Sequence, residues 1–168
     1  KYFKSEYQIL QFFPLELTKF FKNLDTIEIN NSNLSEIHSS DLQQFGEKLT
    51  NLSLENNAIK ILEKNLFKFN PNLERIDFGG NQISFIGHEV FKELKLTKLY
   101  FGDNTCIDGY ATDEAAVKAL LIKVYEDCIG SSESSTSGTS TTQANVISSS
   151  ITNGNLSSNT APPIKLSE

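Results

Sequence analysis

Apolar residues recur along the first two thirds of the chain in a pattern that occurs four times. Each copy has apolar residues or cysteine at its positions 1, 4, 6 and 11, and asparagine or serine at position 9. The copies begin at Leu24, Leu49, Leu73 and Leu96, which lie 25, 24 and 23 residues apart. Alternating apolar and polar residues around positions 3 to 7 predict a short strand in each copy, with positions 4 and 6 facing inward. Units of this length bury their apolar faces by stacking on their neighbours, so we expect parallel strands side by side.

The repeat extends toward the start of the chain. The segment that begins at Ile9 matches the segment that begins at Leu34, at an offset of 25 residues. The matching pairs are Ile9 with Leu34, Phe12 with Ile37, Leu17 with Leu42 and Phe20 with Phe45. We therefore expect the chain to start inside a repeat, with residues 1–4 as the remnant of its strand and with further sequence before Lys1.

The pattern L-x-x-[LI]-x-[LIF]-x-x-[NS]-x-[LIC] resembles the leucine-rich repeat family over nearly all of residues 1–108. It is similar to the C-terminal part of such arrays in secreted arthropod proteins and in Toll-like or chaoptin-like ectodomains. The resemblance implies a β-rich α/β solenoid, a right-handed horseshoe with short parallel strands on its concave face. It also implies loops and 3₁₀ turns on the convex face and a C-terminal capping helix. The family mostly binds proteins, often through the concave sheet.

Two sets of side chains are expected to hold the stack together. The turn after each strand leaves backbone groups without sheet partners, and an asparagine side chain both donates and accepts hydrogen bonds. The expected asparagine ladder is Asn57, Asn81 and Asn104, with Ser32 as a shorter substitute in the first copy. The expected spine of stacked aromatic rings on the opposite side is Phe20, Phe45, Phe67 and Phe91. We interpret the spine as core packing and not as a ligand cage.

Residues 109–129 are expected to cap the open end of the array. Thr112 is a favourable N-cap, and Asp113 and Glu114 suit the first turn of a helix. Apolar residues at helical spacing predict one amphipathic helix that packs on the last repeat: Ala116, Val117, Leu120, Leu121, Val124 and Cys128.

The two cysteines of the chain, Cys106 and Cys128, lie at the two ends of this cap. A disulfide between them would close a loop of about 20 residues and contribute about 3 kcal/mol. It would also indicate an oxidising compartment. Two buried free thiols or a metal pair are the alternatives, although two cysteines without a nearby histidine make a poor zinc site.

Composition narrows the classes of partner. The net charge of −6 over 168 residues argues against nucleic acid and anionic membrane surfaces. No apolar run approaches the roughly 20 residues of a membrane span. Residues 130–168 are dominated by Ser, Thr, Asn and Gly, which predicts a disordered tail or an O-glycosylated stalk. Sequons for N-glycosylation occur at Asn30, Asn33, Asn51 and Asn155.

No catalytic constellation emerges from the sequence, and we expect no enzyme activity, cofactor or metal site. His38 has Ser39, Ser40 and Asp41 beside it. Triad members are brought together by the fold and not by adjacency in the sequence, so turn and cap chemistry is the better interpretation.

The candidate binding face consists of polar residues that alternate with the inward positions: Glu28, Asn51, Ser53, Glu55, Arg75, Asp77, Lys98 and Tyr100. Within it, Arg75, Asp77, Lys98 and Tyr100 form the favoured patch, because Tyr and Arg are enriched at interface hot spots. An ordinary solvated sheet surface is the alternative.

These observations favour a non-catalytic, secreted or cell-surface protein-binding module of adhesion, receptor or innate-recognition type. A matrix solenoid on a glycosylated stalk is one alternative, and an intracellular adaptor with free thiols is another. The sequence identifies neither the protein ligand nor the oligomeric state.

Overall fold

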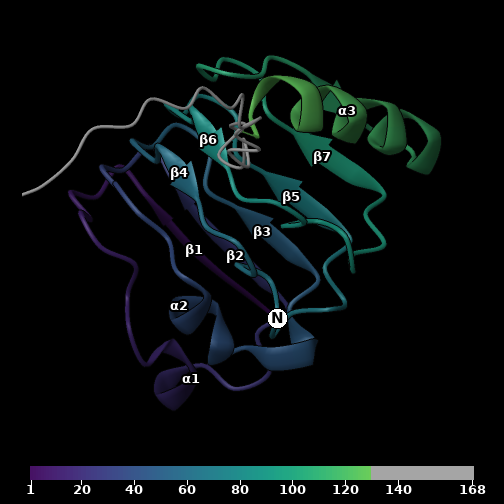
Figure 1. The fold of residues 1–168 in the computed structure, drawn as a ribbon. Coiled ribbons are helices and arrows are strands. Elements are labelled where there is room, and N and C mark those ends of the chain that lie inside the picture. Colours follow the sequence, from purple (N-terminus) through teal and green to yellow (C-terminus); the bar gives the residue numbers. More distant parts are fainter. Residues whose placement is uncertain (130–168) are drawn as a thin grey trace, which may run out of the picture. The chain divides into compact units, whose positions relative to one another are not determined.

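The structure, a computed structural model, describes residues 1–129. The predicted tail or stalk at 130–168 and the sequon at Asn155 lie outside the described residues. Within 1–129, short strands lie side by side, and the connections between them run along the other side of the sheet (Figure 1). The repeat inferred from sequence therefore corresponds to one turn of chain per copy.

A six-stranded sheet forms the framework. Its first five strands are parallel and its last strand is antiparallel. In sheet order they are β1 (Tyr2–Glu6), β2 (Thr26–Asn30), β3 (Asn51–Ser53), β5 (Arg75–Asp77), β7 (Lys98–Tyr100) and β8 (Tyr110–Ala111). Equivalent repeat positions pair across the sheet: Thr26 with Asn51, Asn51 with Arg75, and Arg75 with Lys98. The predicted parallel stacking is confirmed, including the strand at the start of the chain.

The connections contain only short elements. They are α1 (Leu17–Phe20), α2 (Ser39–Gln43), the 3₁₀ helix η1 (Gly46–Lys48) and a second, two-stranded parallel sheet of β4 (Ile61–Leu62) and β6 (Phe85–Ile86). The sequence analysis did not predict this second sheet, because strands of two residues are too short to show a period.

The hydrophobic core lies between the strands of the six-stranded sheet and the connections that run along its other side. The inward-facing residues at positions 4 and 6 of each copy are at most 1% exposed: Ile27, Ile29, Leu52, Leu54, Ile76, Phe78, Leu99 and Phe101. Burial of such side chains contributes roughly 1.5–3 kcal/mol each. The alternation therefore decides which face of the sheet remains available to solvent.

One position just before each ladder residue adopts a left-handed backbone conformation. It is occupied by Asn31, Asn56, Gly80 and Asp103, with φ of 50°, 54°, 64° and 55°. Glycine, asparagine and aspartate tolerate this region better than other residues. A Cβ at Gly80 would lie 2.0 Å from Oδ1 of Asn56, so any other residue there would require the Asn56 side chain to move.

The three asparagines of the ladder make the same set of bonds in successive repeats. Asn81 Nδ2 donates to the carbonyls of Leu54 and Phe78 at 2.8 and 3.0 Å, and its Oδ1 accepts from the Ile59 amide at 3.1 Å. Asn57 and Asn104 repeat this arrangement one turn before and one turn after. In the first copy, the hydroxyl of Ser32 donates only to the Asn30 carbonyl at 3.1 Å. The ladder therefore joins each repeat to the one before it.

The aromatic spine differs from the prediction at its first member. Phe45, Phe67 and Phe91 are buried, but Phe20 is 78% exposed, so its assignment to the spine is wrong. Phe20 lies in the first repeat, whose outer side no described repeat covers. Phe13 takes the inner place: it is 4% exposed, and its ring lies 6.3 Å from that of Phe45.

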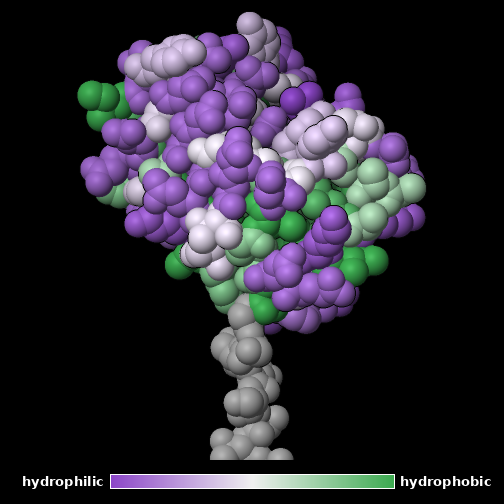
Figure 2. Space-filling view, turned by 90° about the horizontal axis from the view of Figure 1, so that it is seen from above, coloured by the Kyte–Doolittle hydropathy of each residue, from purple (hydrophilic) through white to green (hydrophobic). Residues whose placement is uncertain are grey.

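The cap consists of β8 and the helix α3 (Glu114–Asp127), which buries Val117, Leu120 and Val124. Asp113 is the N-cap and accepts from the Ala116 amide at 2.9 Å, so the predicted cap at Thr112 is wrong by one residue. Both residue types suit this position, and the sequence pattern does not distinguish them. Viewed from above, this end of the molecule is mostly hydrophilic, with small hydrophobic areas (Figure 2).

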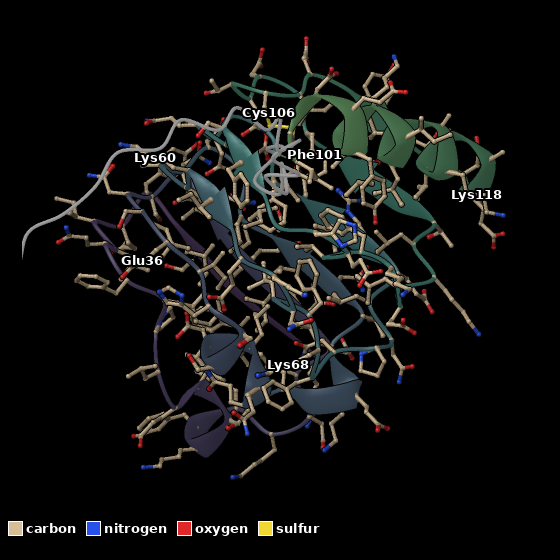
Figure 3. The ribbon with its side chains drawn as sticks, viewed as in Figure 1. Glu36, Lys60, Lys68, Phe101, Cys106 and Lys118 are labelled. Carbon is tan, nitrogen blue, oxygen red and sulfur yellow. A yellow bond between two sulfur atoms is a disulfide. The ribbon has the colours of Figure 1, made fainter. Side chains whose placement is uncertain are left out.

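The predicted disulfide is confirmed. Cys106 and Cys128 are bonded, with their Cα atoms 5.2 Å apart, and Cys106 lies beside α3 in Figure 3. The bond connects the last repeat to the end of α3, which excludes the free-thiol and metal-pair alternatives in this structure. The backbone also links the two parts, because the Ile86 amide donates to the Cys128 carbonyl at 3.1 Å.

Candidate functional site

The outward side of the six-stranded sheet, called here the sheet face, carries the predicted binding residues. Register brings them together in rows: Glu28 beside Ser53, Ser53 beside Asp77, and Asp77 beside Tyr100. Glu55 and Lys98 are exposed, and most of the others are half-buried. The sheet therefore presents these side chains on a single surface.

Asp77 departs from the expectation of an accessible surface residue, because it is only 9% exposed. Nη2 of Arg75 lies 3.5 Å from Asp77 Oδ2, and the Gly79 amide donates to Asp77 Oδ1 at 3.1 Å. Alternation of apolar and polar residues predicts that Asp77 points outward. It does not predict that the neighbouring Arg75 side chain shields Asp77 from solvent. Asp77 consequently orients Arg75 and is itself poorly accessible.

A first hollow of about 400 Å³ lies over β1, β2, β3 and β5. Its charged lining pairs internally, with Lys4 Nζ 3.0 Å from Glu6 Oε1 and 3.7 Å from Glu28 Oε2. The hydrogen bond to Glu6 is the main cause that raises the pKa of Lys4 above its usual value. This hollow is therefore polar, and its two cations, Lys4 and Arg75, already have carboxylate partners.

A second hollow of about 400 Å³ lies beyond the carboxyl ends of β3, β5 and β7. Carboxylates, glycines and two tyrosines line it: Glu55, Asn56, Asp77, Gly79, Gly80, Tyr100, Gly102, Asp103 and Tyr110. The rings of Tyr100 and Tyr110 are nearly parallel, with their centroids 6.4 Å apart. The Arg75 guanidinium stacks on Tyr100 at 5.0 Å. Lys98 is not among the residues that line either hollow.

The sequence analysis missed Tyr110, which is 74% exposed at this site. The residue lies in β8, a strand of two residues that pairs Tyr110 with Tyr100. The only signal in the sequence is an aromatic residue between the last repeat and the cap helix, which carries no period. Tyr110 extends the predicted Arg75–Tyr100 patch toward the cap.

The sequons differ in accessibility. Asn30 is 7% exposed, and its Oδ1 accepts from the Ser53 hydroxyl and the Glu55 amide, so the fold contradicts a glycan at Asn30. Asn33 is exposed. Asn51 is half-buried on the sheet face, and its Nδ2 donates to the hydroxyl of Thr50 at 2.9 Å.

His38 connects two repeats and does not form a triad. Its backbone amide donates to Asp41 Oδ2 at 2.8 Å, and its ring Nδ1 lies 3.4 Å from Glu63 Oε2. Glu63 also accepts from the Ser39 backbone amide at 2.7 Å, which is the main cause that lowers its pKa. Partial burial alone would lower the pKa of His38, but the bond and charge of Glu63 outweigh it and raise that pKa. Asp41 accepts a hydrogen bond from the backbone amide of His38 and does not contact its ring. These residues therefore cap the N-terminus of α2 and do not form a triad.

Between residues 1 and 129, no group of three or more His, Cys, Asp or Glu side chains is placed to hold a metal ion. No helix in the same residues is long and apolar enough to cross a membrane.

Comparison with known proteins identifies the repeat. Residues 47–105 match the family described as leucine rich repeat, so this part of the chain contains leucine-rich repeats. Over 86 residues it is also 27% identical to the NT-3 growth factor receptor of Gallus gallus. The match covers 51% of this chain and 10% of that receptor. The chain therefore spans about a tenth of the length of this relative, and the similarity is distant.

Proposed function

We propose that this chain is a non-catalytic protein-binding module of a secreted or cell-surface leucine-rich repeat protein. In this proposal it belongs to the adhesion, receptor or innate-recognition type and binds its partner through the sheet face. The observation that carries the proposal is the pair of adjoining hollows on that face. Both are lined by charged and polar side chains from several repeats, and the second is also lined by two tyrosines.

The chemistry of the sheet face suits protein recognition. Interface hot spots are enriched in tyrosine and arginine, and Arg75, Tyr100 and Tyr110 lie in one contiguous stack. Short strands in register and the asparagine ladder hold these side chains before a partner arrives. Such preorganisation lowers the entropy that binding must overcome.

The disulfide supports the proposed compartment. Disulfides persist in oxidising environments, which favours a secreted or cell-surface protein over an intracellular adaptor with free thiols. The distant similarity to a growth factor receptor agrees with this location. No observation in residues 1–129 specifically favours the matrix-stalk alternative.

A matched pair of double variants tests the binding face. The oxidised, secreted full chain is screened against an array of purified extracellular proteins, and the affinity of each hit is then measured for three proteins: the parent, the sheet-face variant Tyr100→Ala/Lys98→Glu, and the control Tyr125→Ala/Lys118→Glu. The control makes the same chemical changes on α3, where Lys118 points away from the body of the protein (Figure 3).

We expect the sheet-face variant to lose affinity by at least about ten-fold, which corresponds to about 1.4 kcal/mol. The control should stay within about two-fold of the parent on the same scale. Hits that lose affinity only with the control variant, or that bind all three proteins equally, would overturn the proposal.

A further inference from the structure

The second hollow has a charge that its own fold does not neutralise. Glu55, Asp77 and Asp103 line it, and no lysine or arginine does. Arg75 pairs with Asp77 from outside the lining, while within residues 1–129 neither Glu55 nor Asp103 forms an ion pair. Asp103 and Glu55 are both exposed at the rim. The hollow therefore presents uncompensated negative charge beside two aromatic rings.

The fold does not require small residues at every position that lines the second hollow. Gly80 has a positive φ and lies in close contact with the Asn56 side chain, whereas Gly79 and Gly102 have neither constraint. A Cβ at Gly79 would lie 3.4 Å from its nearest atom, Oδ1 of Asp77. A Cβ at Gly102 would meet only Asp108 Oδ1, at 3.8 Å. Larger side chains are compatible with the backbone at both positions, and they would occupy the hollow.

The sheet face already binds one cation, the guanidinium of Arg75, through the same kinds of group that line the second hollow. Arg75 lies over the ring of Tyr100 at 5.0 Å and beside the carboxylate of Asp77 at 3.5 Å. Tyr110, on the other side of Tyr100 in the sheet order, is 74% exposed. Tyr110 and the unpaired carboxylates of Glu55 and Asp103 offer an aromatic ring and two acceptors of the same kind to a second cation.

We propose that this hollow receives a cationic side chain, arginine in preference to lysine, from a segment of the protein partner. The proposal rests on the proposed function and adds the chemistry of the partner. A guanidinium stacks on aromatic rings and donates two parallel hydrogen bonds to a carboxylate, whereas an ammonium is a hydrated point charge. The volume of about 400 Å³ leaves room for residues that flank the cation. The net charge of −6 favours the approach of a basic partner.

The test uses isotope-labelled, oxidised full chain and NMR titration with a named probe. The probe is the peptide acetyl-Gly-Arg-Gly-amide, and the references are the same peptide with lysine and with citrulline, a neutral isostere of arginine. We expect weak binding, on the order of millimolar, with shifts concentrated at the amides of Gly79, Gly102, Asp103 and Tyr110. The citrulline peptide should bind at least about ten-fold more weakly. Equal binding of citrulline, or shifts spread evenly over other carboxylates such as Glu36, would overturn the proposal.

Two variants locate the site. Gly102→Leu fills the hollow, and Glu55→Gln/Asp103→Asn removes the unpaired charge while asparagine still tolerates the left-handed backbone at position 103. Each should weaken binding of the arginine peptide at least about ten-fold, and Glu36→Gln, a charge control on another surface, should leave it within about two-fold. The spectrum of each variant reports folding directly. If Gly102→Leu disturbs the spectrum, the charge variant decides, and unchanged binding to it overturns the proposal.

The two proposals fail in different ways. If a protein partner loses affinity for the Tyr100→Ala/Lys98→Glu variant but binds Gly102→Leu and the charge variant as well as the parent, the arginine hollow is refuted and the binding face stands. If the arginine peptide binds the hollow but no protein hit depends on the sheet face, the proposed function fails and the hollow stands.

Discussion

Replacing Asn81 by alanine is expected to destabilise the array far more than an average surface substitution. Asn81 is 7% exposed, and both polar atoms of its side chain make hydrogen bonds. Its Nδ2 lies 2.8, 3.0 and 3.3 Å from the carbonyls of Leu54, Phe78 and Gly79. Its Oδ1 accepts from the amide of Ile59, a residue with no exposed surface.

Most of the carbonyls keep a partner when Asn81 is lost. Leu54 O still accepts from Asn57 Nδ2 at 3.0 Å, and Phe78 O from Asn104 Nδ2 at 2.9 Å. The Ile59 amide is the group left without an acceptor, at a cost of about 1–3 kcal/mol. Loss of the two net hydrogen bonds from the amide group adds about 1 kcal/mol each. We therefore expect the free energy of unfolding to fall by about 3–5 kcal/mol.

The assay is urea denaturation of the oxidised chain, followed by far-ultraviolet circular dichroism. Ser32→Ala is the matched control, because Ser32 holds the same repeat position but makes one hydrogen bond, worth about 1 kcal/mol. Asn81→Asp keeps the shape but turns a carboxylate oxygen toward carbonyl oxygens, and we expect it to be at least as destabilising as alanine. A loss for Asn81→Ala no larger than that for Ser32→Ala would refute the ladder argument.

Three further predictions concern the cap, the spine and the His38 contact. Replacing both cysteines by serine should lower the free energy of unfolding by about 3 kcal/mol, given the separation of 22 residues, and addition of a reductant to the parent should reproduce the shift. Phe13→Ala should cost about 3 kcal/mol in urea denaturation and Phe20→Ala less than about 0.5 kcal/mol, and the reverse order would contradict the corrected spine. NMR titration of His38 should give a pKa above about 6.5, and Glu63→Gln should lower it. The contribution of His38 to stability is complete below its ordinary pKa and is lost as the pH rises through its raised pKa. The contribution of Glu63 is complete above its ordinary pKa and is lost as the pH falls through its lowered pKa. The contact therefore stabilises most between about pH 4.3 and 6.5, and a His38 pKa unchanged by Glu63→Gln would show that no such coupling exists.

Period and residue chemistry predict most of the framework. Inward-facing positions follow from alternation, as with Leu52 and Leu54. The two cysteines that flank an amphipathic segment favour a disulfide over free thiols or a metal pair, and the structure contains that disulfide. The misassigned Phe20 shows the limit of this approach. A repeat position has the same residue type in every copy, but its burial depends on whether a neighbouring repeat covers it.

Less of the candidate site than of the framework can be predicted from the sequence. Alternation places Arg75 and Tyr100 on the outward face, but the cover that Arg75 gives Asp77 depends on the rotamers of two side chains. Tyr110 joins the site because a two-residue strand turns back along β7. No period marks such a strand, so the contact between the cap and the last repeat has to be observed.

The cap protects one edge of the six-stranded sheet from fraying. At one edge, no described strand pairs with the outer side of β1, while at the other the antiparallel β8, α3 and the disulfide close the stack. In a solenoid, each repeat is supported only by its neighbours, so local opening starts where a neighbour is lacking. The cap thus opposes local opening at its own edge of the sheet, and the hollow beside Tyr110 lies at that edge.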